Sequence, residues 1–304
     1  MFRHLIIAAA FCAAPALGEI FDVKQFGAAG DGRTDDQQAI QAAAETAART
    51  PGDKVYIPPG VYLHSGIIDV HANTIMEGAG PESVLQAVTP EASAIRFADA
   101  GHCGIRNLKL VSDAPKRLLN DEAAALLFKN SHDCAASGLS IDGAAAAGVN
   151  VHGSNDIVID HVDVRNTRAD GIHVVSGSQR VTVSNNTAVN TGDDGFSAVA
   201  YDNEPQTAGV TFDNNVSMRS QARGVACIGA NDCVIVHNQI YNPAAHGIAV
   251  AWESSYHTWH PHHALIEGNL VRGPITPGME PILIDEASDV TIVSENAPSS
   301  QTLP

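Results

Sequence analysis

The sequence predicts an all-β fold: a right-handed, single-stranded parallel β-helix with an α-helical cap at its N-terminal end. The main observation is a repeat, in which short apolar segments begin at Gly148, Gly171, Gly195, Gly224 and Gly247, at spacings of 23, 24, 29 and 23 residues. A period in the twenties, built from short β-branched runs with Gly, Asn, Asp and Ser at the corners, is typical of a solenoid. The second observation is an alanine-rich helical segment ahead of the repeats, which can cover the open end of the stack.

A second strand-like run supports the same coil. It starts 14 residues before each of the later glycines, at Ile157, Val181, Val210 and Cys233. Each coil therefore holds two or three short strands separated by turns. A leucine-rich repeat is the alternative solenoid, but its leucine positions are missing and Val and Ile dominate.

Stacked coils also predict a column of asparagines. Asn186, Asn215 and Asn238 fall at the same position of successive coils. Stacked amides there would hydrogen-bond along the helix axis, so we assign them to structure rather than to function.

The cysteines fit the same repeat. Cys103 and Cys134 fall in the column that Cys233 occupies later, and successive strands lie about 4.8 Å apart, within the range that a disulfide spans. A Cys103 to Cys134 bridge and a buried stack of thiols both remain open. Cys227 takes an inward strand position and is predicted to be core, and none of the four shows the spacing of a metal site.

The segments follow in order along the chain. Residues 19–53 form the cap, whose helix is predicted to begin with a capping box from Thr34 to Gln37. Residues 54–295 form the parallel β-helix of about ten coils. Residues 296–304 are predicted to be a disordered tail.

The N-terminal residues predict export. Residues 1–18 have a basic start, an apolar stretch and small residues before Glu19, which is the pattern of a secretory signal peptide. We therefore expect a secreted or periplasmic protein and, in solution, a monomer. Without Arg3, the chain keeps 16 basic and 34 acidic residues, a formal charge of −18. This charge argues against nucleic acid and anionic membranes as partners.

Two stretches resemble a known superfamily. FGAAGDGRTDDQQAIQAA followed by KVYIPPGVY is similar to the N-terminal segment of the pectate lyase superfamily of β-helix proteins, which includes the family 28 glycoside hydrolases (polygalacturonases and relatives). NTRADGIHVV and NTGDDGFSAV resemble the polygalacturonase run in which Asn-Thr-Asp-Gly is followed one coil later by Asp-Asp. By position, Asp170 matches the first motif despite the inserted Arg168 and Ala169, and Asp193 and Asp194 match the pair.

The chain departs from that family further on. Where the family has Gly-His-Gly, this chain has Ala222–Gly224, with Arg223 in the centre, and Ala249–Ala251 aligns with the family's Arg-Ile-Lys. No lysine follows Lys129. The family's usual contact with a uronate carboxylate is therefore absent or built differently.

One column of the repeat gathers ionisable residues. An aspartate before a glycine is commonly a turn residue, but stacked carboxylates would repel one another and reduce stability without a use. The four ionisable residues of this column are candidate catalytic residues, and so is Asp193, which lies beside the column. The residues that precede the five repeat glycines are Ala147, Asp170, Asp194, Arg223 and His246.

The carboxylates predict acid–base chemistry. Closely set carboxylates cannot all ionise, so we expect at least one pKa to rise. The resemblance implies an inverting glycoside hydrolase acting on a polysaccharide, with Asp193 as general acid and Asp170 and Asp194 holding the water. Arg223 would orient an aspartate or contact the substrate.

Two alternatives remain open. Asp170, Asp193 and Asp194 could together bind Ca²⁺, which would hold a uronate while Arg223 removes the C5 proton, as in a polysaccharide lyase or uronate epimerase. The third hypothesis is a non-catalytic, carbohydrate-binding solenoid. No other cofactor is expected.

Further residues are candidates for substrate binding. His173 and Ser197 are predicted to point outward from the strands that carry the aspartates. The stretch AWESSYHTWHPHHAL holds Trp252, Tyr256 and Trp259, whose faces could stack on sugar rings or pack within the loop itself. Its four histidines lack a metal-site spacing, and no metal is predicted there.

Overall fold

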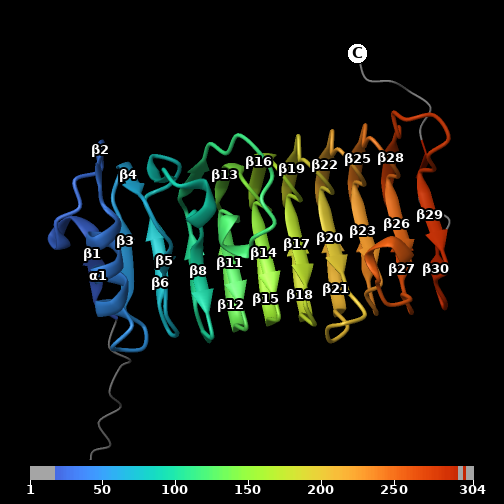
Figure 1. Ribbon diagram of the computed structural model, residues 1–304. Coiled ribbons are helices and arrows are strands. Elements are labelled where there is room, and N and C mark those ends of the chain that lie inside the picture. Colours follow the sequence, from blue (N-terminus) through green and yellow to red (C-terminus); the bar gives the residue numbers. More distant parts are fainter. Residues whose placement is uncertain (1–17, 294–296, 299–304) are drawn as a thin grey trace, which may run out of the picture.

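The computed structural model describes residues 18–293 and 297–298, and in them the chain winds into a parallel β-solenoid (Figure 1). Each coil contributes one strand to each of up to three parallel sheets, which run along the length of the molecule. The predicted parallel β-helix with a helical cap is confirmed. The expected signal peptide lies outside the described residues, apart from Gly18.

The three sheets are named A, B and C. Sheet A contains β1 (Ile20–Asp22), β3 (Lys54–Ile57), β6 (Ile75–Gly78), β9 (Gly104–Arg106), β12 (His132–Ser137), β15 (Asn155–Asp160), β18 (Gln179–Ser184), β21 (Ala208–Asp213), β24 (Val234–Val236), β27 (Leu265–Glu267) and β30 (Thr291–Ile292). Sheet B contains β2 (Asp31–Asp35), β4 (Gly60–His64), β7 (Ser83–Ala87), β10 (Lys109–Ser112), β13 (Ser140–Ala144), β16 (Asp163–Thr167), β19 (Thr187–Val189), β22 (Val216–Met218), β25 (Gln239–Tyr241), β28 (Leu270–Arg272) and β31 (Ala297–Pro298). Sheet C contains β5 (Ile68–Asp69), β8 (Ile95–Ala98), β11 (Leu126–Lys129), β14 (Val149–His152), β17 (Ile172–Val175), β20 (Phe196–Val199), β23 (Val225–Ile228), β26 (Ile248–Ala251) and β29 (Ile282–Asp285). The helices are α1 (Gln37–Ala47) and the short 3-10 helices η1 (Val23–Phe26), η2 (Pro90–Ala92), η3 (Asp121–Ala123) and η4 (Ser254–Tyr256).

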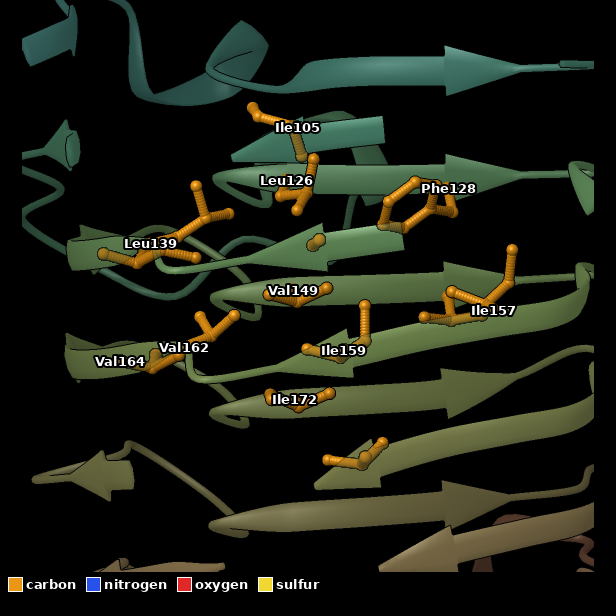
Figure 2. Close-up of a cluster of buried hydrophobic side chains, with 14 of the residues drawn as sticks. Ile105, Leu126, Phe128, Leu139, Val149, Ile157, Ile159, Val162, Val164 and Ile172 are labelled. Atoms are coloured by element: carbon orange, nitrogen blue, oxygen red, sulfur yellow. The ribbon is translucent and has the colours of Figure 1, made fainter. Parts of the chain in front are cut away.

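The core is a set of apolar columns inside the coils. Val149 of β14 pairs in register with Ile172 of β17, and Figure 2 shows both among the buried side chains of neighbouring coils. Ile157 of β15 likewise pairs with Val181 of β18. Since side chains alternate along a strand, this register keeps the same face of every coil inside.

The asparagine column is present and is longer than predicted. The side-chain amide of Asn186 donates to Asn215, Asn215 donates to Asn238, and Asn238 donates to Asn269, each at 3.0 Å. All four are buried. Each amide therefore bonds to the coil above or below, which is the structural role that the sequence predicts.

The cap is the short helix α1, and the predicted capping box is wrong. Thr34 belongs to β2 and its hydroxyl donates to Asp31. The N-cap residue is Asp36, whose carboxylate accepts the backbone N–H groups of Ala29 and Gly30 at 2.7 and 3.0 Å and does not cap the helix. This acid is used to fix the preceding loop, and so the helix begins two residues later than the pattern suggests.

The cap covers the end of sheet C with side-chain amides. Gln41 of α1 accepts the backbone N–H of Asp69 at 2.9 Å and donates to its carbonyl at 3.2 Å. Gln37 accepts the N–H of Gly66 at 3.2 Å. Because an unpaired strand edge would expose these groups, α1 closes the stack as well as covering its core.

Both pairs of cysteines are bridged. The Cys103–Cys134 disulfide, one of the two arrangements left open by the sequence, joins adjacent coils with Cα atoms 4.6 Å apart. Cys227, predicted to be a core thiol, is buried but bonded to Cys233, with Cα atoms 6.6 Å apart. The repeat did not reveal this pair because the two cysteines lie in one coil, Cys227 on β23 and Cys233 directly before β24.

The two ends of the solenoid are formed by the N-terminal and C-terminal segments of the described chain. The 19–53 segment contributes β1 and β2 to the sheets as well as α1. Most of the 296–304 segment lies outside the described residues, and Ala297–Pro298 forms β31. Among the described residues, no helix has the length and apolar composition that a membrane crossing requires.

Candidate active site

The candidate site lies where each coil passes from sheet B to sheet C. Asp170 and Asp194 end this turn, just before the glycines that lead into β17 and β20. Asp170 accepts the backbone N–H of Asp194 at 2.9 Å, and Asp194 accepts that of Arg223 at 2.8 Å. One oxygen of each carboxylate therefore connects two coils, as a turn aspartate would.

The second oxygen of each carboxylate faces a cation. The Asp170 Oδ2 atom lies 2.9 Å from His173 Nδ1. The Asp194 Oδ2 atom accepts a bond of 3.1 Å from Arg223, whose guanidinium also donates to Glu253 at 3.1 Å. Asp170 and Asp194 are 7% and 3% exposed, so these charges lie in a poorly solvated setting where they interact strongly.

Asp193 has a partner from a distant part of the chain. Arg117 donates to its carboxylate at 2.6 Å, across 76 positions of sequence. The segment that carries this arginine follows β10 and is held over the turn by two bonds. Leu118 N–H donates to the Ala145 carbonyl at 2.8 Å, and Arg168 donates to the carbonyl of Ala114 at 2.7 Å.

These groups line one cavity of about 540 Å³. That volume is within the range of small-molecule sites. The lining of this cavity includes residues of β14, β17, β20 and β23, strands that lie in the middle part of the stack (Figure 1). The charged residues among its lining are Arg117, Asp121, Asp170, His173, Asp193, Asp194, Arg223 and Glu253.

Burial and the neighbouring groups shift the pKa values of the two stacked aspartates in opposite directions. Burial raises the pKa of Asp194 to about 8; the Arg223 charge opposes this, and the charges of Asp170 and Asp193 add to it. Burial alone would also raise the pKa of Asp170, but His173, the Asp194 amide and Arg117 outweigh it and lower the value. Near neutral pH, a protonated carboxyl therefore lies beside an ionised one.

Two more titratable groups share the cavity. Burial alone would lower the pKa of His173, but the adjacent Asp170 raises it above the ordinary value. Burial raises the pKa of Tyr201, and the Asp170 charge raises it further. The site thus combines a buried acid, a histidine that can exchange a proton and a phenol that stays protonated.

The three aspartates could also hold a metal ion. Each offers one oxygen, and these oxygens lie within 4.8 Å of one another. Oxygen ligands suit Ca²⁺. However, each carboxylate already faces a histidine or arginine, at 2.9, 2.6 and 3.0 Å, so an ion would have to displace or share these partners.

Some predicted site residues lie away from the cavity. His246 continues the column but its ring accepts the backbone N–H of Glu280 at 3.0 Å. Ser197 is fully buried, and its hydroxyl lies 2.7 Å from His173 Nδ1, so it supports that ring. Neither residue is among those that line the cavity.

The three aromatic residues of the loop differ in whether they pack within the protein or face the cavity. Trp252 stacks on His260 with ring centroids 4.7 Å apart and donates to the Thr258 carbonyl, so it packs within the loop. Trp259 donates to the Glu204 carbonyl outside the cavity lining. Tyr256 lines the cavity and is 63% exposed, which leaves its ring free to meet a sugar.

Four charged or phenolic groups of the cavity lining were not predicted from the sequence. Arg117 and Asp121 lie in a segment without repeat character, and no pattern links Arg117 to Asp193. Tyr201 and Glu253 each lie two residues after a repeat strand, β20 and β26. Their positions just after repeat strands could have identified them, because residues that follow parallel strands of one sheet lie near the same edge of that sheet.

Comparison with known proteins gives the family context. The mannuronan C5-epimerase AlgE5 of Azotobacter vinelandii is 28% identical over 90% of this chain and 26% of its own length. Alginate lyase 7 of the same organism is 27% identical over 71% of this chain and 24% of its own length. The chain thus spans about a quarter of these curated relatives.

A solved structure has the same fold. The catalytic unit of a thermostable GH87 α-1,3-glucanase from Streptomyces thermodiastaticus superposes with a TM-score of 0.70 at 20% identity, covering 92% of this chain and 59% of that one. At this identity the likeness concerns the fold alone. These proteins support the predicted superfamily but not the narrower resemblance to family 28 hydrolases.

A family profile matches most of the chain. Its description is rhamnogalacturonase A/epimerase, pectate lyase-like, and the match covers residues 20–263. That range includes the cap, the strands from β1 to β26 and every charged residue of the cavity lining. The chain therefore belongs to the rhamnogalacturonase A/epimerase, pectate lyase-like family.

Proposed function

We propose that this chain is a polysaccharide-modifying enzyme that moves the C5 proton of a uronate residue, as a C5-epimerase or a lyase does. The observation that carries the proposal is the buried Asp194, which is held between Asp170 and Arg223 in the cavity and whose pKa is raised to about 8 by burial. The named relatives, mannuronan C5-epimerases and an alginate lyase, support the same class.

The chemistry needs a neutralised carboxylate. Breaking the C5–H bond sends its electron pair into the adjacent uronate carboxyl group, which develops a second negative charge. A carboxylic acid kept neutral by burial can donate a hydrogen bond to that group. Asp194 would supply this bond, and the guanidinium groups of Arg117 and Arg223 would provide positive charge.

The proton itself needs a base and an acid. The Nδ1 atom of His173 is bonded to Asp170, which leaves Nε2 to accept the C5 proton when the ring is neutral; because Asp170 raises the pKa of His173, this form requires a pH above the ordinary histidine value. Tyr201 keeps its phenolic proton because its pKa is raised, and it would serve as the donor. Return of a proton to the opposite face of C5 gives the epimer. Expulsion of the C4 oxygen, which takes the proton, gives the unsaturated product of a lyase.

A hydrolase is the second candidate, and the opposite pKa shifts of Asp194 and Asp170 favour it. A protonated Asp194 would give its proton to the glycosidic oxygen, and the ionised Asp170 would activate water. The proton donor would then be Asp194 and not Asp193, which pairs with Arg117. We further propose that the enzyme is exported, since residues 1–18 have the pattern of a secretory signal peptide.

The products distinguish these reactions. Mannuronan, polygalacturonate and a neutral α-1,3-glucan would be incubated with the enzyme, with and without EDTA. The proposal predicts a changed uronate ratio or an unsaturated, ultraviolet-absorbing product from one of the two uronans and none from the glucan. Reducing ends without either signal would support the hydrolase, and binding without any product would support a non-catalytic solenoid. Loss of activity in EDTA that Ca²⁺ restores would indicate that the three aspartates bind a calcium ion that the reaction needs.

A further inference from the structure

A second cluster of polar side chains lies at another corner of the solenoid. Here each coil passes from sheet C to sheet A, before β9 and at the start of β12 (Figure 1). Asp133 stacks on His102 of the preceding coil, and His132 stacks on Gly101. None of these residues lines the cavity of the candidate active site.

The three polar groups converge on one point. The Asp133 Oδ2 atom lies 2.8 Å from His132 Nδ1 and 3.9 Å from His102 Nδ1. The two imidazole rings are 5.6 Å apart and nearly perpendicular, at 85°. One ligand atom from each residue lies within 4.8 Å of the other two. The same carboxylate oxygen thus faces a nitrogen of both rings.

The backbone holds this arrangement in place. His102 and Asp133 both occupy the left-handed region, at φ values of 56° and 53°. Each is followed directly by a cysteine of the Cys103–Cys134 disulfide, which ties the two turns together. A site already held in this way loses little conformational entropy when it binds a ligand.

The donor set defines the ligand. Two imidazole nitrogens and one carboxylate suit Zn²⁺ and similar transition metals, whereas Ca²⁺ and Mg²⁺ prefer oxygen alone. The side chains of His102, His132 and Asp133 are 67%, 55% and 49% exposed, so water can complete the coordination. The next acid along the column, Asp156, is occupied by Arg180 at 2.7 Å.

We propose that His102, His132 and Asp133 form a surface site for a divalent transition metal, with Zn²⁺ as its representative. The metal bridges two coils next to the disulfide. Because it binds the folded chain more tightly than the unfolded one, it raises the melting temperature further as the free metal concentration exceeds the dissociation constant. The site is independent of the reaction proposed above.

The chain offers a matched control at the same corner. His263 has a φ of 53° and is 66% exposed, and it lies 3.6 Å from both Asp232 and Asp289. It therefore has the same backbone conformation and acidic neighbours as His102. It is not part of any group of three converging ligand atoms found among the described residues.

The experiment is calorimetric titration of the untagged full chain with ZnCl₂ near neutral pH, with melting curves in Zn²⁺ and in EDTA. Asparagine tolerates the left-handed backbone, so the variants are His102→Asn, His132→Ala and the control His263→Asn. We expect His102→Asn and His132→Ala to weaken Zn²⁺ binding at least about tenfold and to abolish its effect on melting, while His263→Asn behaves as wild type. Melting in EDTA should be the same for all four proteins.

Two results would overturn the proposal. One is a wild-type chain that neither binds Zn²⁺ at this corner nor melts at a higher temperature in its presence. The other is a His263→Asn variant that loses as much Zn²⁺ affinity as His102→Asn, because general surface histidines would then account for the binding.

Discussion

At the scale of single residues, Asp194 serves two purposes with one carboxylate. Its Oδ1 atom accepts the backbone N–H of Arg223, as a turn residue would, and its Oδ2 atom faces the guanidinium of the same residue. Repeats of this turn in successive coils bring Asp170 and Asp194 together. The pKa of about 8 follows from burial against that acidic neighbour.

The first prediction concerns turnover by Asp194→Asn. Asparagine keeps the shape and can accept the Arg223 amide bond, but its NH₂ group is a weaker hydrogen-bond donor than a carboxylic acid and cannot deliver a proton. We expect kcat to fall about 10²–10³-fold, measured on whichever polysaccharide the wild type converts. The matched control is Asp213→Asn, which breaks an Asp–His pair outside the cavity, at 2.9 Å from His237. Equal turnover by Asp194→Asn and wild type would remove Asp194 from the chemistry.

The second prediction concerns stability and pH. Since the pKa of Asp194 is raised from 3.8 to about 8 on folding, its contribution to stability is fully present below pH 3.8 and is lost as the pH rises through about 8. Asparagine does not titrate. The free energy of unfolding of Asp194→Asn, relative to wild type, should therefore increase as the pH rises from 4 to 8. Urea melts of both proteins across this range test it, and a relative decrease would mean that the folded pKa is lowered instead.

At the scale of elements, the asparagine ladder and the Cys103–Cys134 disulfide connect successive coils inside the solenoid. Asn215 accepts from Asn186 and donates to both Asn238 and the Val183 carbonyl, at 2.8 to 3.0 Å. All of these groups are shielded from water. Removing the amide would leave several of them without a partner.

The third prediction follows for the ladder. Asn215→Ala should lower the free energy of unfolding by at least about 2 kcal/mol, because buried donors and acceptors lose their partners. The control is Asn214→Gly, which removes the neighbouring exposed amide bonded to Asn185 and keeps a backbone with φ of 55° accessible. We expect the control to change stability by less than about 1 kcal/mol. Equal effects in denaturant melts would show that the buried ladder adds no particular stability.

At the scale of the whole molecule, the repeat accounts for what could be predicted from the sequence. Its period places Asp170, Asp194 and Arg223 in one column, because a solenoid converts equal spacing into spatial contact. It says nothing about Arg117, which reaches Asp193 from a segment that breaks the repeat. The orientation of side chains is also beyond the pattern: His246 shares the column, yet its ring bonds to the chain outside the cavity.

The fold also explains why the sequence predicts the residues of the site better than the reaction that they catalyse. An acidic column at this turn suits hydrolysis, elimination and epimerisation alike, and the sequence resemblance favoured hydrolysis. Burial raises the pKa of both carboxyl groups, and the neighbouring charges and hydrogen bonds, which no motif reveals, decide which of them keeps its proton. The protonated Asp194 beside His173 and Tyr201 is what favours proton transfer at C5.

The central claim is tested most directly by reaction in D₂O. Mannuronan would be incubated with the wild-type chain and with Asp194→Asn, and the recovered residues would be examined by NMR for deuterium at C5. We expect deuterium in the epimerised residues made by the wild type, or unsaturated ends if C4–O cleavage follows, and formation of either about 10²–10³-fold more slowly by the variant. Cleaved chains that retain hydrogen at C5 and carry new reducing ends would contradict it, because the enzyme would then be a hydrolase.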